Sequence, residues 1–132
     1  MNMTPRTSVI ARRAMLGVFT SFLLVASIGP KLTGAAVATD SLVELGWPAS
    51  SAISLGWLEL ACLVLVLVPR TRVFGALLMT AFLGGAVATH VRAASPLFSH
   101  VLFGAYLGML MWGAILLEDA RLRALVFGRG RS

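Results

Sequence analysis

Apolar residues fall into four long runs along the chain, and short polar segments separate these runs. The runs lie at about 14–30, 50–68, 73–91 and 97–117. Each has roughly the length that a helix needs to cross the ~30 Å hydrocarbon layer of a bilayer. A proline stands where a helix is expected to stop or start, at Pro30, Pro69 and Pro96. The pattern predicts an all-α fold, with one domain over residues 1–132 that forms an integral membrane four-helix bundle.

The polar segments predict smaller features. Residues 1–13 are expected to lie outside the first helix and to be loosely ordered. The longest connection, residues 31–50, contains Asp40–Glu44, where we expect a short helix at the membrane surface, and Trp47, which is suited to anchor that surface. The basic segment after Leu117 is expected to form an amphipathic turn or two along the opposite surface.

Basic residues gather at the two ends of the predicted bundle in unequal numbers. One end has nine of them: Arg6, Arg12, Arg13, Arg70, Arg72, Arg121, Arg123, Arg129 and Arg131. The other end has two, Lys31 and Arg92. Because short cytoplasmic segments carry the excess of Lys and Arg, both termini are predicted to be cytoplasmic, with four spans. The Arg-, Ala- and Gly-rich composition indicates a bacterium, so the expected location is the inner membrane, as a multi-pass protein surrounded by the lipid bilayer.

Composition excludes several classes of protein. Of the 132 residues, 58% are hydrophobic and 12% are charged. Charged residues make up about a quarter of an ordinary soluble domain, so the composition argues against that class. The net charge of +6 does not indicate nucleic-acid binding, because the basic residues stand at the ends of apolar runs and not along one face of a helix. Cys62 is the single cysteine, which excludes an intramolecular disulfide and a redox pair.

A cleaved signal peptide is the competing interpretation of the N-terminal region. The region has a basic start, an apolar run and a cleavage-like Ala36-Val37-Ala38. The apolar run is long for a signal peptide, and cleavage would leave three spans with a mismatched charge pattern. We therefore favour a first transmembrane helix.

Small residues at helical spacing predict where the helices pack closely. They are Gly17 and Ser21 in the first run, Ala81, Gly84, Gly85 and Ala88 in the third, and Gly104 and Gly108 in the fourth. Helices in lipid associate through such faces because lipid tails are as apolar as leucine. A second interpretation is that these residues form a slot for a flat ligand.

Glu59 is the most informative residue, because it is a lone carboxylate within the second apolar run. An unpaired charge there costs several kcal/mol, so Glu59 is expected to be protonated or paired. The expected partners lie at the same end of the bundle, on the outer side: Lys31, His90, Arg92 and His100. An ion pair of Glu59 with Lys31 or with Arg92 would explain why these two basic residues lie at the outer end, although Lys and Arg are in excess on the cytoplasmic side. Both a structural pair and a ligand-binding or proton-accepting carboxylate remain open.

A metal site built from Glu59, His90 and His100 is a weaker alternative. Imidazole and carboxylate groups suit zinc or iron, but the two histidines stand ten residues apart across a turn, which is no diagnostic spacing. We expect no metal. His90 and Arg92 are two residues apart, so they are expected to point to different faces of their helix.

Four stretches carry a resemblance to a known family. They are Ser27-Ile28-Gly29-Pro30-Lys31-Leu32-Thr33-Gly34, Gly56-Trp57-Leu58-Glu59-Leu60, Pro69-Arg70-Thr71-Arg72 and Gly84-Gly85-Ala86-Val87-Ala88-Thr89-His90-Val91-Arg92. With these stretches the chain resembles the DoxX-like bacterial membrane proteins from about residue 14 to 125. The resemblance implies a four-helix membrane bundle in which Lys31, Glu59, His90 and Arg92 occupy characteristic positions. The chain departs from the family pattern at Glu118-Asp119, where a basic residue beside an aspartate is expected.

Three hypotheses for function follow. In the first, an outer-side pocket binds a small hydrophobic or quinone-like molecule, with Glu59 and His90 as acid–base groups and Lys31, Arg92 and His100 as ligand-binding groups. Wider relatives resemble subunits of quinone-linked redox assemblies, which implies a membrane redox partner protein; a homo-oligomer is also open, and no cofactor is indicated. The second hypothesis is a proton-coupled small-molecule transporter, which requires an unpaired Glu59. The third is a non-catalytic membrane assembly partner.

Overall fold

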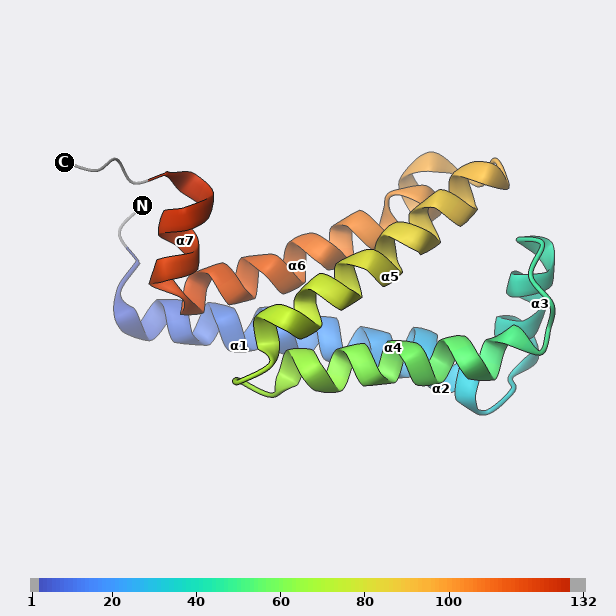
Figure 1. Ribbon diagram of the computed structural model, residues 1–132, viewed down its shortest axis with the longest axis horizontal. Coiled ribbons are helices and arrows are strands. Elements are labelled where there is room, and N and C mark those ends of the chain that lie inside the picture. Colours follow the sequence, from blue (N-terminus) through green and yellow to red (C-terminus); the bar gives the residue numbers. More distant parts are fainter. Residues whose placement is uncertain (1–2, 129–132) are drawn as a thin grey trace.

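Four long helical segments run along the long axis of the computed structural model, which describes residues 3–128 (Figure 1). The first segment joins α1 (Pro5–Phe22), the π-helical turn η1 (Leu23–Ile28) and α2 (Gly29–Leu32). The other three are α4 (Ser51–Leu67), α5 (Arg72–Arg92), and the π-helical turn η2 (Leu97–Val101) followed by α6 (Phe103–Glu118). The shorter helices α3 (Ala36–Glu44) and α7 (Ala120–Phe127) lie near opposite ends of the molecule (Figure 1). The predicted all-α class is confirmed for the described part of the chain.

Three segments are long and apolar enough to cross a membrane: Pro5–Leu32, Arg72–Arg92 and Leu97–Glu118. The remaining apolar helix, α4, has 17 residues, which corresponds to about 26 Å at ~1.5 Å per residue. Both α4 and α5 begin and end within one residue of the segments predicted at 50–68 and 73–91. Length and composition alone thus support a membrane location.

The first helix is longer than expected at both ends. It begins at Pro5, because the hydroxyl of Thr4 accepts a hydrogen bond from the backbone N–H of Thr7 at 3.3 Å and Pro5 occupies the first turn. The prediction that residues 1–13 precede the helix is therefore wrong from Pro5 onward. The helix also continues past Pro30, because the preceding turn is π-helical: the N–H of Gly29 bonds to the carbonyl of Leu24.

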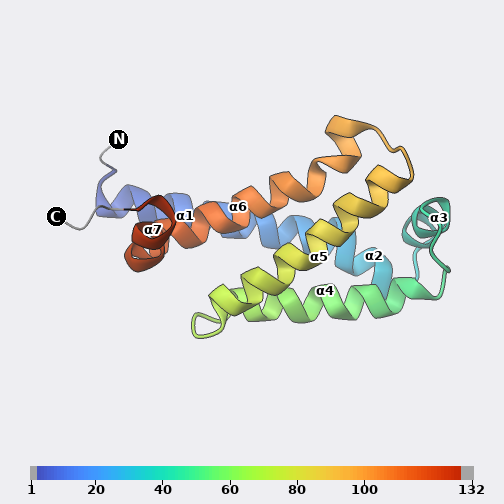
Figure 2. The ribbon, with the colours of Figure 1, turned by 45° about the horizontal axis from the view of Figure 1, so that its top comes forward.

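The helices are held together unequally at the two ends. α1 packs along α6, α4 along α5, and α5 along α6, while η1 and α2 contact α4. Toward the end of the molecule where α3 lies (the α3 end), η2 and the end of α5 diverge from α2 and α4 (Figures 1 and 2). The opposite end (the α7 end) is closed by a largely apolar core, whose largest buried side chains include Phe19, Leu63, Met79, Met111 and Ile115.

Most of the glycines predicted to pack closely do not lie at close contacts between helices. A Cβ on Gly75 would lie 2.5 Å from the backbone of Leu65 and Val66, so this glycine lets α5 approach α4. Gly104 faces the Leu83 carbonyl, where a Cβ would come within 3.1 Å, as expected for a packing position. By contrast, a Cβ on any of four other predicted packing glycines would meet nothing within 4 Å: Gly17, Gly84, Gly85 and Gly108. The prediction of close packing is thus wrong for these four within the described chain.

Glu118 joins three helices at the α7 end. Its carboxylate pairs with Arg12 of α1 at 2.6 Å and also with Arg72 of α5. Arg72 in addition donates to the carbonyls of Val66 and Leu67, at 2.9 and 3.1 Å, at the end of α4. Glu118 is therefore a cross-link between helices.

α7 is a defined helix that turns away from α6 (Figures 1 and 2). Asp119 begins it, since its carboxylate accepts the backbone N–H groups of Arg121 and Leu122 at 2.9 and 3.0 Å. Within the basic segment after Leu117, the expected turn or two is a helix of eight residues. Arg129 and Arg131 of the predicted basic end lie outside the described residues.

Candidate ligand-binding site

A cavity of about 690 Å³ lies at the α3 end of the molecule. Six parts of the chain line it: η1 with α2, α3 with the turn after it, α4, α5, η2 and α6. Its wall is mainly apolar, and its polar residues include Ser27, Lys31, Glu59, His90 and His100. The structure thus brings together four of the five predicted site residues, and adds Ser27.

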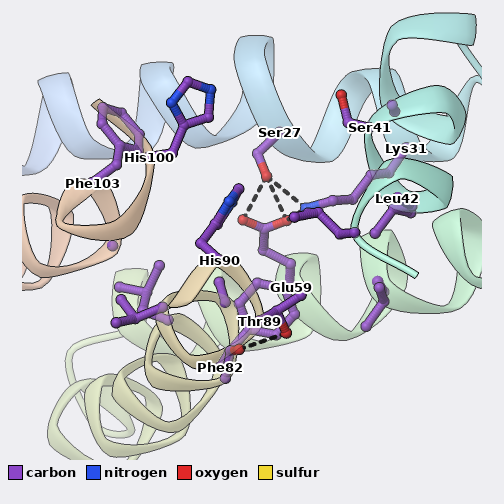
Figure 3. A pocket seen from close by; sticks show the side chains of 18 of the residues that line it. Ser27, Lys31, Ser41, Leu42, Glu59, Phe82, Thr89, His90, His100 and Phe103 are labelled. Atoms are coloured by element: carbon purple, nitrogen blue, oxygen red, sulfur yellow. Dashed lines mark hydrogen bonds and ion pairs between the residues drawn. The ribbon is translucent and has the colours of Figure 1, made fainter. Parts of the chain in front are cut away.

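Glu59 lies in the wall of this cavity and is almost completely buried, at 1% exposure. Lys31 Nζ lies 2.6 Å from Glu59 Oε2 and 2.7 Å from Ser27 Oγ. Ser27 Oγ in turn lies 2.9 Å from each carboxylate oxygen. Of the two ion pairs expected for Glu59, with Lys31 or with Arg92, the structure forms the one with Lys31. We refer to these three residues, of which Glu59 is buried and Ser27 and Lys31 are partly buried, as the buried triad (Figure 3).

Local backbone structure positions the buried triad. Ser27 lies in η1 and Lys31 one turn later in α2, so the π-helical turn sets the angle at which both side chains leave the helix. On the facing helix, Gly56 lies one turn before Glu59, and a Cβ there would come within 3.0 Å of Lys31 Cβ. The absence of a side chain at Gly56 therefore allows α4 to approach α2 at the level of the ion pair.

The ammonium group of Lys31 keeps one donor available. It has three N–H groups, and its hydrogen bonds within residues 3–128 go to two acceptors, Ser27 and Glu59. The ring of Phe82 lies beside it, with 5.5 Å between Nζ and the ring centroid. Both residues line the cavity, so the remaining N–H can serve a bound molecule.

Two histidines contribute to the same cavity from α5 and η2. Their rings meet edge to face with centroids 5.7 Å apart. His90 Nδ1 lies 3.0 Å from Ser95 Oγ, and His100 Nδ1 lies 2.7 Å from Ser99 Oγ. In each ring Nδ1 thus forms a hydrogen bond with a nearby serine hydroxyl. Among residues 3–128 neither Nε2 has a hydrogen-bond partner. Figure 3 shows both rings on the side of the carboxylate away from Lys31.

Arg92 does not join this group. Its guanidinium donates to the carbonyl of Leu45 at 2.7 Å and lines a separate hollow with Gly46, Trp47, Ala88 and Thr89. The expected ion pair between Arg92 and Glu59 is not formed. The sequence did indicate that His90 and Arg92 point to different faces, and they do line different hollows.

Two contributors to the site, Ser27 and Phe82, were not predicted from the sequence. Ser27 stands four residues before Lys31, and residues four apart on a helix share a face, so this spacing was an available signal. Phe82 has no comparable signal, because phenylalanine is common throughout the apolar runs. Among residues 3–128 no group of three or more His, Cys, Asp or Glu side chains is arranged to hold a metal ion.

The family follows from comparison with known proteins. The sequence profile of the DoxX-like family matches residues 14–114, which is most of the chain and includes all five predicted site residues. The protein therefore belongs to the DoxX-like family. No curated protein and no solved structure matches the chain.

Proposed function

We propose that this DoxX-like protein crosses the bacterial inner membrane four times, with its α3 end on the outer side. Three spans have sufficient length on their own. α4 runs antiparallel beside α5 (Figure 1), and at about 26 Å it is close to the ~30 Å hydrocarbon thickness. The excess of arginine at the α7 end supports a cytoplasmic location for that end.

The proposed function is to bind a small, hydrophobic, quinone-like molecule in the cavity at the α3 end. The observation that carries this proposal is the Lys31–Glu59 ion pair in the wall of a mainly apolar cavity, with the carboxylate almost completely buried and one ammonium N–H unused. Ligand sites combine an apolar lining with a few placed polar groups. Because Glu59 neutralises Lys31, a neutral ligand with a carbonyl or hydroxyl oxygen fits better than a carboxylate or a cation.

The polar groups have distinct roles in this proposal. Lys31 donates its third N–H to a ligand oxygen, and Glu59 provides the counter-charge and can accept a proton. His90 and His100 offer Nε2 on the other side, where each can donate or accept a hydrogen bond. Any redox chemistry would need a cofactor or a membrane redox partner protein, because the chain has a single cysteine, which is buried.

Two alternatives make different use of the buried triad. Proton-coupled transport of a cation at Glu59 requires a carboxylate that is free to exchange partners, and the contacts with Lys31 and Ser27 count against it. A non-catalytic assembly partner would use the same triad to hold α2 against α4. It needs no ligand, so ligand detection separates it from the proposed function.

Native mass spectrometry of the detergent-extracted protein tests the proposal. We expect wild-type protein to carry a small hydrophobic molecule, or to bind added decylubiquinone, and His100→Phe to bind at least tenfold more weakly. His100 is exposed and outside the buried triad, so this variant should fold. Glu118→Gln, which removes a carboxylate at the α7 end, is the control and should bind like wild type.

The opposite result is equally clear. Wild-type protein without a small molecule and without affinity for decylubiquinone would contradict the proposed function. Equal binding by wild type and His100→Phe would place any ligand outside the cavity. A co-purified protein without a small molecule would support the assembly role.

A further inference from the structure

Arg92 connects two parts of the chain that otherwise have little contact. It stands at the end of α5 and donates to the carbonyl of Leu45, just after α3, at 2.7 Å. Within residues 3–128 this is the hydrogen bond that joins the segment 36–50 to α5. The neighbouring Gly46 has φ +84°, and a Cβ there would lie 2.8 Å from Arg92 Nη2. The turn after α3 is thus shaped to admit the guanidinium.

α3 forms one wall of the cavity. Val37, Ala38, Ser41 and Leu42 of α3 line it, followed by Leu45 in the turn. The opposite wall includes most of the residues of α5 between Ala81 and His90. Figures 1 and 2 show α3 lying across the ends of α2 and α4, and Figure 3 shows Ser41 and Leu42 beside Lys31. Arg92 therefore bridges the two walls.

α3 is weakly attached apart from this bridge. Its single buried residue is Leu42, at 9% exposure. Glycines with positive φ bound it, Gly34 at +67° and Gly46 at +84°, so the chain changes direction on both sides. Helices with few buried contacts open at low free energy.

We propose that α3 is a lid over the cavity and that Arg92 is the positioning residue that latches it to α5. The inference rests on the proposed function, because the lid would admit the ligand of that cavity. It also explains why Arg92 lies at the α3 end, although Lys and Arg are in excess on the cytoplasmic side. Its guanidinium binds a backbone carbonyl and not the carboxylate of Glu59. Opening would begin with release of the Leu45 carbonyl.

Hydrogen exchange on ligand-free protein tests the latch without any assumption about the ligand. In Arg92→Gln we expect amide exchange in peptides covering 36–47 to rise about tenfold or more, as for loss of one charge-assisted hydrogen bond. Exchange in α4, which supports the other side of the cavity, should stay unchanged. Arg92→Lys should restore part of the protection. Arg70→Gln removes an equal charge at an exposed position of the α7 end and should have no effect on α3.

A second variant and a binding measurement complete the test. Gly46→Ala keeps Arg92 but displaces its guanidinium, so it should raise exchange in the same peptides. Release of decylubiquinone should also become faster in Arg92→Gln. Unchanged exchange over 36–47 in both Arg92→Gln and Gly46→Ala would overturn the latch, as would an equal rise throughout the protein. Failure of the proposed function is a different result, namely local opening of α3 in a protein that binds no ligand.

Discussion

A single carboxylate, Glu59, organises the α3 end of the molecule. It is nearly fully buried, and its cationic partner Lys31 has a side chain that is 16% exposed. Taking two charges out of water costs several kcal/mol each, and mutual attraction with further hydrogen bonds must offset that cost. Ser27 contributes by contacting both charged groups. Removing one partner alone should therefore cost more than replacing both.

A double-mutant cycle measures this asymmetry. We expect Glu59→Gln to lower the free energy of unfolding by about 3 kcal/mol, because Lys31 loses the carboxylate that neutralises it. Lys31→Met combined with Glu59→Gln should recover most of that loss. Unfolding in mixed detergent micelles, followed by circular dichroism, gives the free energies.

The matched control is Glu118→Gln at the α7 end. The Glu118 side chain is 33% exposed, so its pairs with Arg12 and Arg72 are screened and about 1 kcal/mol or less is expected. If the double variant at residues 31 and 59 were as unstable as Glu59→Gln alone, the pairing of Lys31 with Glu59 would not account for the stability of this region.

For individual residues, some contacts were predictable from the sequence and others were not. An isolated carboxylate in an apolar run must find a partner, which is why Glu59 and Lys31 were recognised. Arg92 was misassigned, because charge alone cannot distinguish a carboxylate partner from a backbone carbonyl. The contact of His90 with His100 depends on how η2 turns the chain, and no residue spacing encodes that turn.

Among the helices, the π-helical turn η1 has the largest effect on the site. It lies between α1 and α2 and carries Ser27, and Lys31 follows in the next turn. The sequence around Gly29-Pro30 predicted an end to the helix, whereas the structure continues it to Leu32. A proline after a widened turn loses no hydrogen bond that the helix needs. A sequence pattern shows where the hydrogen bonding of a helix is interrupted, but not whether the helix continues beyond the interruption.

Gly29 is the residue that this turn requires. A Cβ there would lie 2.6 Å from the carbonyl oxygen of Leu24, and a backbone atom cannot move aside without a change in the turn. We expect Gly29→Ala to lower the free energy of unfolding by about 2 kcal/mol and to disturb the contact of Lys31 with Glu59. The measurement is again detergent unfolding, with decylubiquinone binding as a second readout.

Gly17→Ala is the matched control on the same helix. A Cβ at Gly17 meets nothing within 4 Å, so alanine should be neutral or stabilise by up to about 1 kcal/mol through its higher helix propensity. Equal stability of Gly29→Ala and Gly17→Ala would show that η1 tolerates a side chain and that its geometry is not set by Gly29.

For the molecule as a whole, the two ends have different tasks. The α7 end is cross-linked through Glu118, and Arg123 binds the last carbonyls of α6, including Leu117 at 3.0 Å. Arginines that the charge pattern explained by topology alone thus also hold helix ends. The α3 end diverges around the cavity (Figure 2). The hydrophobic pattern predicted the helices, and the charge pattern predicted which basic residues share an end of the molecule. Which arginines form ion pairs depends on packing between segments far apart in the sequence.

The last prediction concerns α4, the shortest of the four long segments. If α4 crosses the membrane, then Ala49 and Arg70, which flank it, must face opposite sides. We expect a membrane-impermeant maleimide to label Ala49→Cys in intact spheroplasts, and Arg70→Cys and Ala124→Cys only after permeabilisation. The natural Cys62 is 3% exposed and should remain unlabelled in the wild-type control. Labelling of Ala49→Cys and Arg70→Cys from the same side would show that α4 does not span, and would reduce the protein to the three spans whose length is sufficient on its own.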